Sequence, residues 1–346
     1  MKINLYLDSG YIDAGTIMDK MAADGIHMGL IWSPRRAGKT TTFIKTIYER
    51  GGVMLYVRRT EIEAKIAMSP GTSDIVKALT VAGVSPDDIT IDTTAQGGIG
   101  VVSVYGKEFC KILAISTFRN KRGFDASNCT CIVYDEFIPE KNAPSMTGED
   151  WALWGLIDTV YSNRTTPLDV YMLGNTNRID CRVFQSLDLI DDVADMLVHG
   201  VRIREVTEGQ GGRNLLLINA FDSPIAKRRA YTGLYQMIGT RGDYAGMALE
   251  NKFTDYDDSG IAPAPKKGLR PYFSHDGLFY YYMPGGDIYI NRHPLGDFSE
   301  CTLPSGAMGD SIYYRQYEPG LAAYSDAGRV RYETPAAKVL AQSKIY

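Results

Sequence analysis

The sequence has few of the residues from which disulfide frameworks and metal sites are built. Its 346 residues include five cysteines and four histidines. No two cysteines are spaced as Cys-x-x-Cys, and the histidines lack the spacing of metal ligands. These shortages argue against a disulfide scaffold and a zinc-binding module, and reduced thiols are typical of a cytoplasmic protein.

Long apolar runs and an excess of basic residues are also missing. No stretch approaches the roughly 18–20 apolar residues of a membrane span, and the N-terminus lacks the apolar core of a signal peptide. The 37 Lys and Arg residues against 41 Asp and Glu residues leave a net charge of −4. Proteins that coat nucleic acid are normally basic. We therefore expect no membrane partner, and any contact with DNA or RNA has to come from local loops.

Short apolar runs alternate with amphipathic stretches over the first two thirds of the chain. This pattern is typical of an α/β domain with a mostly parallel sheet. Thr147 and Asp150 resemble a capping signal for the start of a helix. We expect one side of this helix to carry Trp151, Trp154, Ile157 and Tyr161. The predicted strands are 27–32, 53–57, 98–105, 109–116, 130–134 and 169–173, and the predicted helices include 39–50 and 147–163.

The composition changes after residue 221, which suggests a second domain. A basic run at 227–229 opens a short helical segment, and a Pro- and Lys-containing linker follows at 263–268. Apolar runs at 278–283 and 288–291 flank a Pro-Gly-Gly-Asp turn, and Thr334-Pro335 can start a terminal helix. We predict a domain at 1–221, a helical linker at 222–257 and a small α+β domain at 258–346.

The strongest motif lies between the first predicted strand and the following helix, where residues 33–40 read Ser-Pro-Arg-Arg-Ala-Gly-Lys-Thr. In a P-loop (Walker A motif), backbone N–H groups surround the phosphates, the Lys reaches the β/γ-phosphates and the hydroxyl binds Mg²⁺. Ser33 stands where the motif usually has Gly. A chance Gly-Lys-Thr is the alternative, but the strand before the motif and the helix after it favour phosphate binding. The residues predicted to bind the nucleotide are Ser33, Pro34, Arg35, Arg36, Ala37, Gly38, Lys39, Thr40 and Thr41.

A second motif, Cys-Ile-Val-Tyr-Asp-Glu, ends the strand predicted at 130–134. In this Walker B motif, Asp135 can hold Mg²⁺ through water, together with Thr40, while Glu136 polarises the attacking water. A solvated acidic strand end is the alternative. Asn175, after the next strand, is suited to contact the γ-phosphate or that water, although it can equally be an ordinary loop residue. The motifs together predict ATP hydrolysis.

Several arginines could complete such a site. Ring-shaped ATPases usually need a cation from the neighbouring subunit, and Arg122 or Arg164 could supply it, whereas Arg35 could act within its own subunit. Each could also be a solvated loop charge. Arg58 and Arg59 end the second predicted strand, where they could contact either the adenine side of a nucleotide or a nucleic-acid backbone.

Four further blocks carry a family resemblance. They are residues 56–59, 132–138, 158–164 and 249–253. In this order they resemble the DNA-packaging (encapsidation) ATPase of phi-29-type bacteriophages, from about residue 31 to residue 253. The resemblance implies a terminase-like ASCE (RecA-like) P-loop domain, assembled as a homopentameric ring on the portal, or connector, of an empty prohead. Such a motor drives double-stranded DNA inward, often with a structural packaging RNA.

The resemblance also assigns residues. Lys39 matches the family's P-loop, and Asp135 and Glu136 match its Mg²⁺-binding and catalytic carboxylates. Arg122 falls where the family has a basic residue proposed to act on the neighbour's nucleotide. A proposed arginine finger of the family is replaced by Ser162, while Arg164 matches a second Arg of that block.

The family's tail domain is a degenerate RNase H-type fold, and the resemblance extends that expectation to 258–346. The run at 278–283 contains no carboxylate, so we expect this domain to bind portal, RNA or DNA rather than to cleave DNA. The function predicted is a viral genome-packaging motor, in the host cytoplasm and transiently on the prohead portal vertex, but not in the mature virion. The alternatives are a terminase-like ATPase with an active nuclease, and a nucleotide-switched assembly protein with little turnover.

Overall fold

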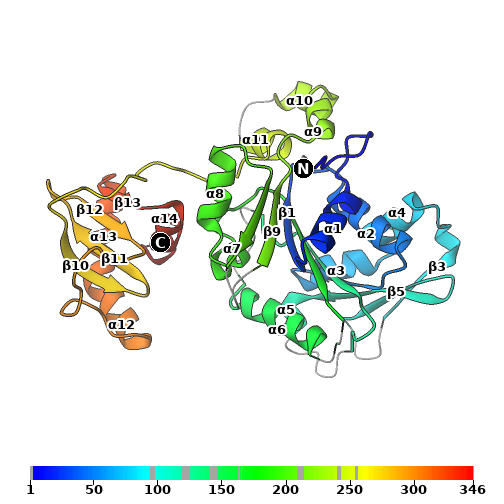
Figure 1. Ribbon diagram of the computed structural model, residues 1–346, viewed down its shortest axis with the longest axis horizontal. Helices are drawn as coiled ribbons and strands as arrows, with labels where there is room; N and C mark the ends of the chain where they lie inside the picture. Colours follow the sequence, from blue (N-terminus) through cyan, green and yellow to red (C-terminus); the bar gives the residue numbers. More distant parts are fainter. Residues whose placement is uncertain are drawn as a thin grey trace. The chain divides into compact units, whose positions relative to one another are not determined.

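The computed structural model divides the chain into two compact units (Figure 1). The first comprises Met1–Ser186 and Asp195–Asp255, and the second Leu187–Ala194 and Tyr256–Tyr346. The structure describes residues 3–93, 98–118, 125–140, 143, 146–162, 164, 166–208, 214–239, 243–253 and 256–345.

The described residues of the first unit form a nine-stranded sheet in the order β3-β4-β5-β2-β6-β7-β1-β9-β8. Adjacent strands from β5 to β9 in this order pair in parallel, while β3–β4–β5 and β8–β9 pair antiparallel at the two edges. The mostly parallel sheet predicted from the sequence is confirmed. The strands are β1 (Met28–Trp32), β2 (Met54–Arg58), β3 (Ile89–Thr93), β4 (Gly100–Val104), β5 (Lys107–Ala114), β6 (Cys131–Asp135), β7 (Asp169–Gly174), β8 (Ile203–Thr207) and β9 (Asn214–Asn219).

Helices cover both faces of this sheet (Figure 1). Every residue of β2 and β6 is buried, as expected for central strands of a parallel sheet. Ile31 of β1 packs in one core with α1 and α2, whereas its neighbour Trp32 meets Phe184 of α7 edge-on at 5.8 Å. The described helices up to residue 255 follow, with α8 divided between the two units. They are α1 (Ala14–Ala23), α2 (Lys39–Glu49), α3 (Glu61–Met68), α4 (Asp74–Val81), α5 (Ile115–Phe118), α6 (Glu149–Tyr161), α7 (Arg182–Ser186), α8 (Ile190–Val198), α9 (Pro224–Arg229), α10 (Gly233–Ile238) and α11 (Asp243–Glu250).

Helices α9, α10 and α11 occupy the segment predicted as a linker at 222–257. They fall in the first unit rather than forming a part of their own. Tyr235 of α10 and Met247 of α11 share a small buried cluster, and arginines of α9 donate to backbone carbonyls near the start of the chain and in the P-loop. These contacts tie the segment to the sheet domain.

The prediction for α6 is wrong in two respects. Its N-cap is Gly148, in a left-handed conformation (φ +66°), and no side chain caps the helix, so Thr147 and Asp150 form no capping box. The side chain of Trp151 is 76% exposed, because the helix buries the neighbouring stripe instead. This helix is apolar on most of its surface, so periodicity alone could not choose the buried face. The stripe that it buries contains Ala152, Leu153, Leu156 and Val160.

A buried ion pair joins β2, β6 and α6. Nε of Arg59 donates to the two carboxylate oxygens of Glu149 at 3.1 and 3.0 Å, and the Tyr134 hydroxyl donates to the same carboxylate at 2.7 Å. Arg59 and Glu149 are 5% and 3% exposed. Glu149 is thus a buried acceptor for both the Arg59 guanidinium and the Tyr134 hydroxyl, and its removal takes these bonds from the network.

We expect Glu149→Ala to lower the free energy of unfolding by about 3–5 kcal/mol, because the bonds of a buried carboxylate to Arg59 and to Tyr134 are lost together. Urea unfolding of the full chain measures this loss. The control is Glu61→Ala, because the Glu61–Lys65 pair is solvent-exposed and such pairs contribute about 1 kcal/mol or less. Equal losses in the two variants would contradict the stabilising role of the buried network.

The second unit is the small α+β domain predicted at the C-terminal end. Its described residues form a four-stranded sheet in the order β10-β11-β12-β13, antiparallel except for the last pair. The predicted strand–turn–strand at 278–291 is confirmed, as is the terminal helix, where Thr334 Oγ1 accepts from the Ala337 N–H at 3.2 Å. The elements are β10 (Arg270–His275), β11 (Leu278–Tyr282), β12 (Ile288–Asn291), α12 (Ala307–Ile312), a π-helical turn (Tyr313–Tyr317), α13 (Glu318–Asp326), β13 (Val330–Tyr332) and α14 (Pro335–Ile345).

Aromatic side chains make up much of the core of this unit. Phe273 of β10 stacks on Tyr280 of β11 with ring centroids 4.2 Å apart. Within the described ranges, no group of three or more His, Cys, Asp or Glu residues could hold a metal ion. Binding of portal, RNA or DNA by this unit, rather than cleavage of DNA, stays a prediction.

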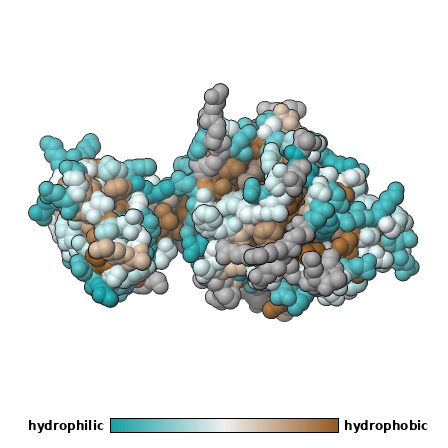
Figure 2. All heavy atoms as spheres, turned by 90° about the horizontal axis from the view of Figure 1, so that it is seen from below, coloured by the Kyte–Doolittle hydropathy of each residue, from teal (hydrophilic) through white to brown (hydrophobic). Residues whose placement is uncertain are grey.

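The surface is mixed in polarity. On the face shown in Figure 2, brown areas are separated by teal and pale ones. None of the described helices is both long enough and apolar enough to cross a lipid bilayer.

Candidate nucleotide-binding site

The segment predicted as a P-loop connects the end of β1 to the start of α2. Arg36 and Gly38 within it adopt left-handed conformations, with φ +62° and +88°. A Cβ atom at Gly38 would also lie 2.8 Å from the ring of Tyr11, so the position requires glycine for space as well as for conformation. Alternating left-handed residues of this kind turn successive N–H groups toward one concavity, which is an anion-binding arrangement.

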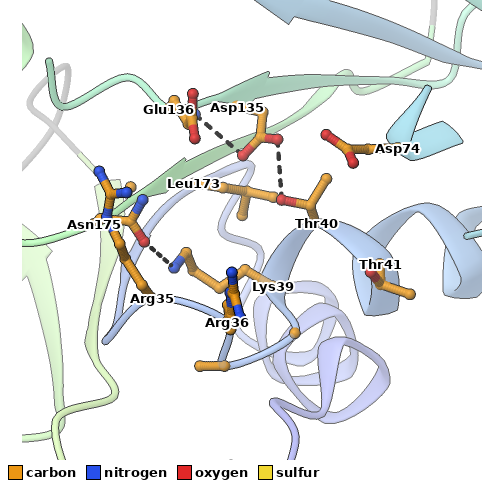
Figure 3. Close-up of a pocket in the computed structure, with 13 residues that line it drawn as sticks. Arg35, Arg36, Lys39, Thr40, Thr41, Asp74, Asp135, Glu136, Leu173 and Asn175 are labelled. Carbon is orange, nitrogen blue, oxygen red and sulfur yellow. Dashed lines mark hydrogen bonds between the residues drawn. The ribbon is translucent and has the colours of Figure 1, made fainter. Parts of the chain in front are cut away.

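This loop lines a cavity of about 310 Å³ at the carboxyl ends of the parallel strands (Figure 3). The cavity brings together most of the residues predicted to bind or hydrolyse the nucleotide. Ser33 and Pro34, the first residues of the loop, are buried and do not line the cavity. Asp74, at the start of α4, lines it as well, although nothing in the sequence singled this residue out. The lining residues are Arg35, Arg36, Ala37, Gly38, Lys39, Thr40, Thr41, Asp74, Asp135, Glu136, Leu173, Gly174 and Asn175.

Lys39 is held by neutral oxygens. Its Nζ donates to Ser33 Oγ at 2.8 Å and to Asn175 Oδ1 at 2.9 Å, and the residue is 7% exposed. Burial lowers the pKa of Lys39 to about 8, against the opposing attraction of Asp135 and Glu136. Ser33, in place of the usual Gly, thus supplies an acceptor that Gly has no side chain to offer.

Thr40 and Asp135 meet in the same cavity. Thr40 Oγ1 donates to Asp135 Oδ2 at 2.9 Å, and that oxygen also accepts from the Tyr56 hydroxyl at 2.7 Å. A P-loop hydroxyl beside a strand-end carboxylate is the donor set that holds Mg²⁺ in P-loop ATPases. The residues present therefore fit this ion.

Glu136 follows directly, in a left-handed backbone conformation (φ +58°) that non-glycine residues seldom adopt. Its N–H donates to Asp135 Oδ1 at 3.1 Å, and its carboxylate is paired with Arg58 Nη2. The side chain of Glu136 is 48% exposed. Partial loss of solvent in the cavity raises the pKa of Glu136, whereas the guanidinium of Arg58 acts in the opposite direction. Backbone strain and a shifted pKa at one carboxylate are typical of a catalytic position.

Arg58 contacts both carboxylates. Besides Glu136, its Nη1 donates to Asp135 Oδ2 at 3.1 Å, and the residue is only 8% exposed. The guanidinium of Arg58 is thus engaged by the two carboxylates, and a contact with adenine or with a nucleic-acid backbone stays a prediction. The sequence could not reveal this role, because β2 and β6 become neighbours only in the folded sheet.

Replacement of Arg58 should change the pH dependence of hydrolysis. Without the guanidinium, the pKa of Glu136 rises further, so a larger fraction of this carboxyl is protonated in acid and unable to accept a proton from water. We expect the acidic limb of the pH profile of kcat/KM, which reports the free protein in which Arg58 and Glu136 are paired, to shift toward higher pH in Arg58→Gln. An unshifted limb would show that Arg58 does not act on the group that accepts the proton.

The arginines predicted to complete the site have different surroundings. Arg35 lines the cavity and is paired with Glu140. Arg164 does not line it: its Nη1 donates to the carbonyl of Cys129, before the start of β6 and thus at the opposite end from Asp135. Arg122 lies outside the described residues. An action of Arg122 or Arg164 on a neighbouring subunit stays a prediction.

Solved structures with the same fold come from bacteriophage packaging machinery. The structure of the bacteriophage phi-29 viral genome packaging motor assembly superposes with a TM-score of 0.64 and 19% identity, covering 99% of this chain and 100% of that one. The phi-28 gp11 DNA packaging motor superposes with a TM-score of 0.60 and 14% identity, covering 94% and 95%. No protein-family model and no curated protein matches the sequence. The chain thus has, over both of its units, the fold of the phage DNA-packaging motor proteins that its sequence resembles.

Proposed function

We propose that this protein is the ATPase of a viral genome-packaging motor, which hydrolyses ATP to move double-stranded DNA into a prohead. One observation carries the proposal: Lys39, the Thr40–Asp135 pair and Glu136 line a single cavity at the P-loop. The whole chain shares its fold with packaging-motor structures, and this likeness supports coupling of ATP hydrolysis to the movement of DNA.

Each residue of the cavity has a part in this proposal. Lys39 exchanges its bonds to Ser33 and Asn175 for phosphate oxygens of ATP, since charged acceptors bind it more strongly than neutral ones. Thr40 and Asp135 would hold Mg²⁺, which neutralises charge on the phosphates. Glu136 leaves Arg58 and accepts a proton from the attacking water. Asn175, released by Lys39, is then available to the γ-phosphate or to that water.

The proposal includes an assembly. A homopentameric ring on the portal would let Arg122 or Arg164 reach the nucleotide of the next subunit. Double-stranded DNA would pass through the ring, with a structural packaging RNA as a further partner, in the host cytoplasm and transiently on the prohead. The net charge of −4 suits such a ring better than a monomer that binds DNA tightly, since affinity scales with the number of phosphates neutralised.

The test is the steady-state ATPase rate of the full chain, with and without long double-stranded DNA, over a range of protein concentrations at low salt. We expect DNA to stimulate the rate, and the rate per subunit to rise with protein concentration because active sites are shared. A slow ATPase rate that DNA does not change, even with proheads present, would contradict the motor function and favour a nucleotide-switched assembly protein. Metal-dependent DNA cleavage would favour an ATPase with an active nuclease.

A further inference from the structure

Helix α9 reaches the P-loop through one side chain. Nη1 of Arg229, the last residue of α9, donates to the backbone carbonyl of Arg35 at 2.7 Å. The guanidinium also lies 5.8 Å from the ring centroid of Tyr235, which is buried in the cluster formed by α10 and α11. The sequence of the basic run at 227–229 indicates only the opening of a helix, and the nucleotide site gives this run no role.

The anchored carbonyl determines the direction of the N–H next to it. In a trans peptide the C=O and N–H groups point in opposite directions, and the carbonyl of Arg35 shares its peptide with the N–H of Arg36. Arg229 holds that carbonyl on the side of α9, so the N–H of Arg36 points away from the guanidinium. Arg36 is itself one of the residues that line the cavity. A second anchor acts two residues later, where the carbonyl of Ala37 accepts from the Ile12 N–H at 3.0 Å.

The backbone of the loop needs such anchors. Arg36 has φ +62° although it is not glycine, and residues with a Cβ atom adopt this region only where their surroundings hold them there. Without the bond to Arg229, the peptide between Arg35 and Arg36 is free to turn and to withdraw one N–H from the anion-binding concavity. The loop's shape therefore depends on a residue almost 200 positions away in the chain.

We propose that Arg229 is a positioning residue for the P-loop: it holds the peptide between Arg35 and Arg36 in the orientation that binds phosphate. This inference rests on the proposed binding of ATP at this loop. If Arg229 positions the loop, the affinity for nucleotide depends on the position of α9, even though α9 need not contact the nucleotide.

The neighbouring Arg228 provides a matched control. It belongs to the same helix, and its Nη2 also donates to a backbone carbonyl, that of Ser9, at 2.6 Å. Ser9 lies outside the P-loop. Replacement of either arginine removes one positive charge and one bond to a carbonyl, but only Arg229→Ala removes a bond to the P-loop itself.

The experiment measures the affinity of the full chain for Mg·ATP by calorimetry. We expect about tenfold weaker binding for Arg229→Ala, the loss typical of one oriented donor to a charged group, and less than about twofold for Arg228→Ala. Arg229→Lys keeps the charge and a donor, so it should stay within about threefold of the wild type. Thermal unfolding of each variant checks that the fold is intact. If Arg229→Ala is unstable, Arg229→Lys replaces it in the binding measurement and in the double-mutant cycle with Arg36→Gly.

A double-mutant cycle separates shaping of the loop from general stabilisation. Glycine adopts a left-handed conformation without penalty, so in the Arg36→Gly background the effect of replacing Arg229 should shrink to less than about threefold. An equal loss in both backgrounds, or equal losses for the Arg228 and Arg229 variants, would overturn the inference. If the wild-type chain fails to bind Mg·ATP, the proposed function fails instead.

Discussion

Glu136→Gln is expected to bind ATP with nearly wild-type affinity and to hydrolyse it about 10²–10⁴-fold more slowly, the range for removal of a general base. The amide has the size of the carboxyl, so the cavity keeps its shape, but it cannot accept a proton from water. Glu136 also adds negative charge near the phosphates, so its neutralisation should not weaken binding. Single-turnover hydrolysis and equilibrium binding, measured on the same preparation, separate the two effects.

Glu140→Gln is the matched control for this substitution. Glu140 lies four residues further along the chain and is solvent-exposed, with 70% of its side chain accessible. It contacts Arg35 but does not line the cavity. We expect its turnover to stay within about threefold of the wild type. Full turnover in Glu136→Gln would show that another group accepts the proton.

Lys39→Ala is expected to weaken ATP binding by about a hundredfold, because it removes a buried donor to a charged ligand. The fold should survive, since the partners left behind are the hydroxyl of Ser33 and the amide of Asn175 rather than a buried charge. Calorimetric titration with Mg·ATP measures the loss. Wild-type affinity in this variant would show that the cavity is not the nucleotide site.

The pKa of Lys39 adds a pH dependence to the same measurement. Below a pKa of about 8 the ammonium is charged and binds phosphate. As pH rises through 8, the free protein loses this proton and affinity should fall, by up to about tenfold per pH unit. Lys39→Arg stays charged at these pH values, so its affinity should not fall over the same range. A flat wild-type profile between pH 8 and 9.5 would contradict the depressed pKa.

The local motifs of this protein could be predicted from the sequence because each depends on residues close together in the chain. The apolar run before residue 33 and the amphipathic run after residue 39 form β1 and α2 with the loop between them. The carboxylates at the end of β6 and the amide after β7 reach the same cavity, since parallel strands place their carboxyl ends at one edge of a sheet. Spacing and strand order carry that information.

Other features of the site arise between segments far apart in the chain. Arg58 could be assigned to the carboxylates only once β2 was seen beside β6, and Arg229 to the P-loop only once α9 was in place. The position of Asp74 in the cavity also depends on contacts between distant segments. So does the buried face of α6, because this helix carries two apolar stripes and either could face the core. A side chain can contact either of two partners that suit it equally, and the sequence does not state which one lies within reach.

The amino-acid sequence by itself thus determined the type of fold, the P-loop and the pair of carboxylates, since hydrophobic periodicity and short-range spacing act within single elements. Only the tertiary structure decided which arginine side chains lie beside the P-loop and the two carboxylates. Arg58 lies on the carboxylates, Arg229 on a loop carbonyl, and Arg164 on a carbonyl before β6. The physical reason is that a guanidinium bonds to any carboxylate or carbonyl within its reach, and only the packing of the elements decides which of these is near.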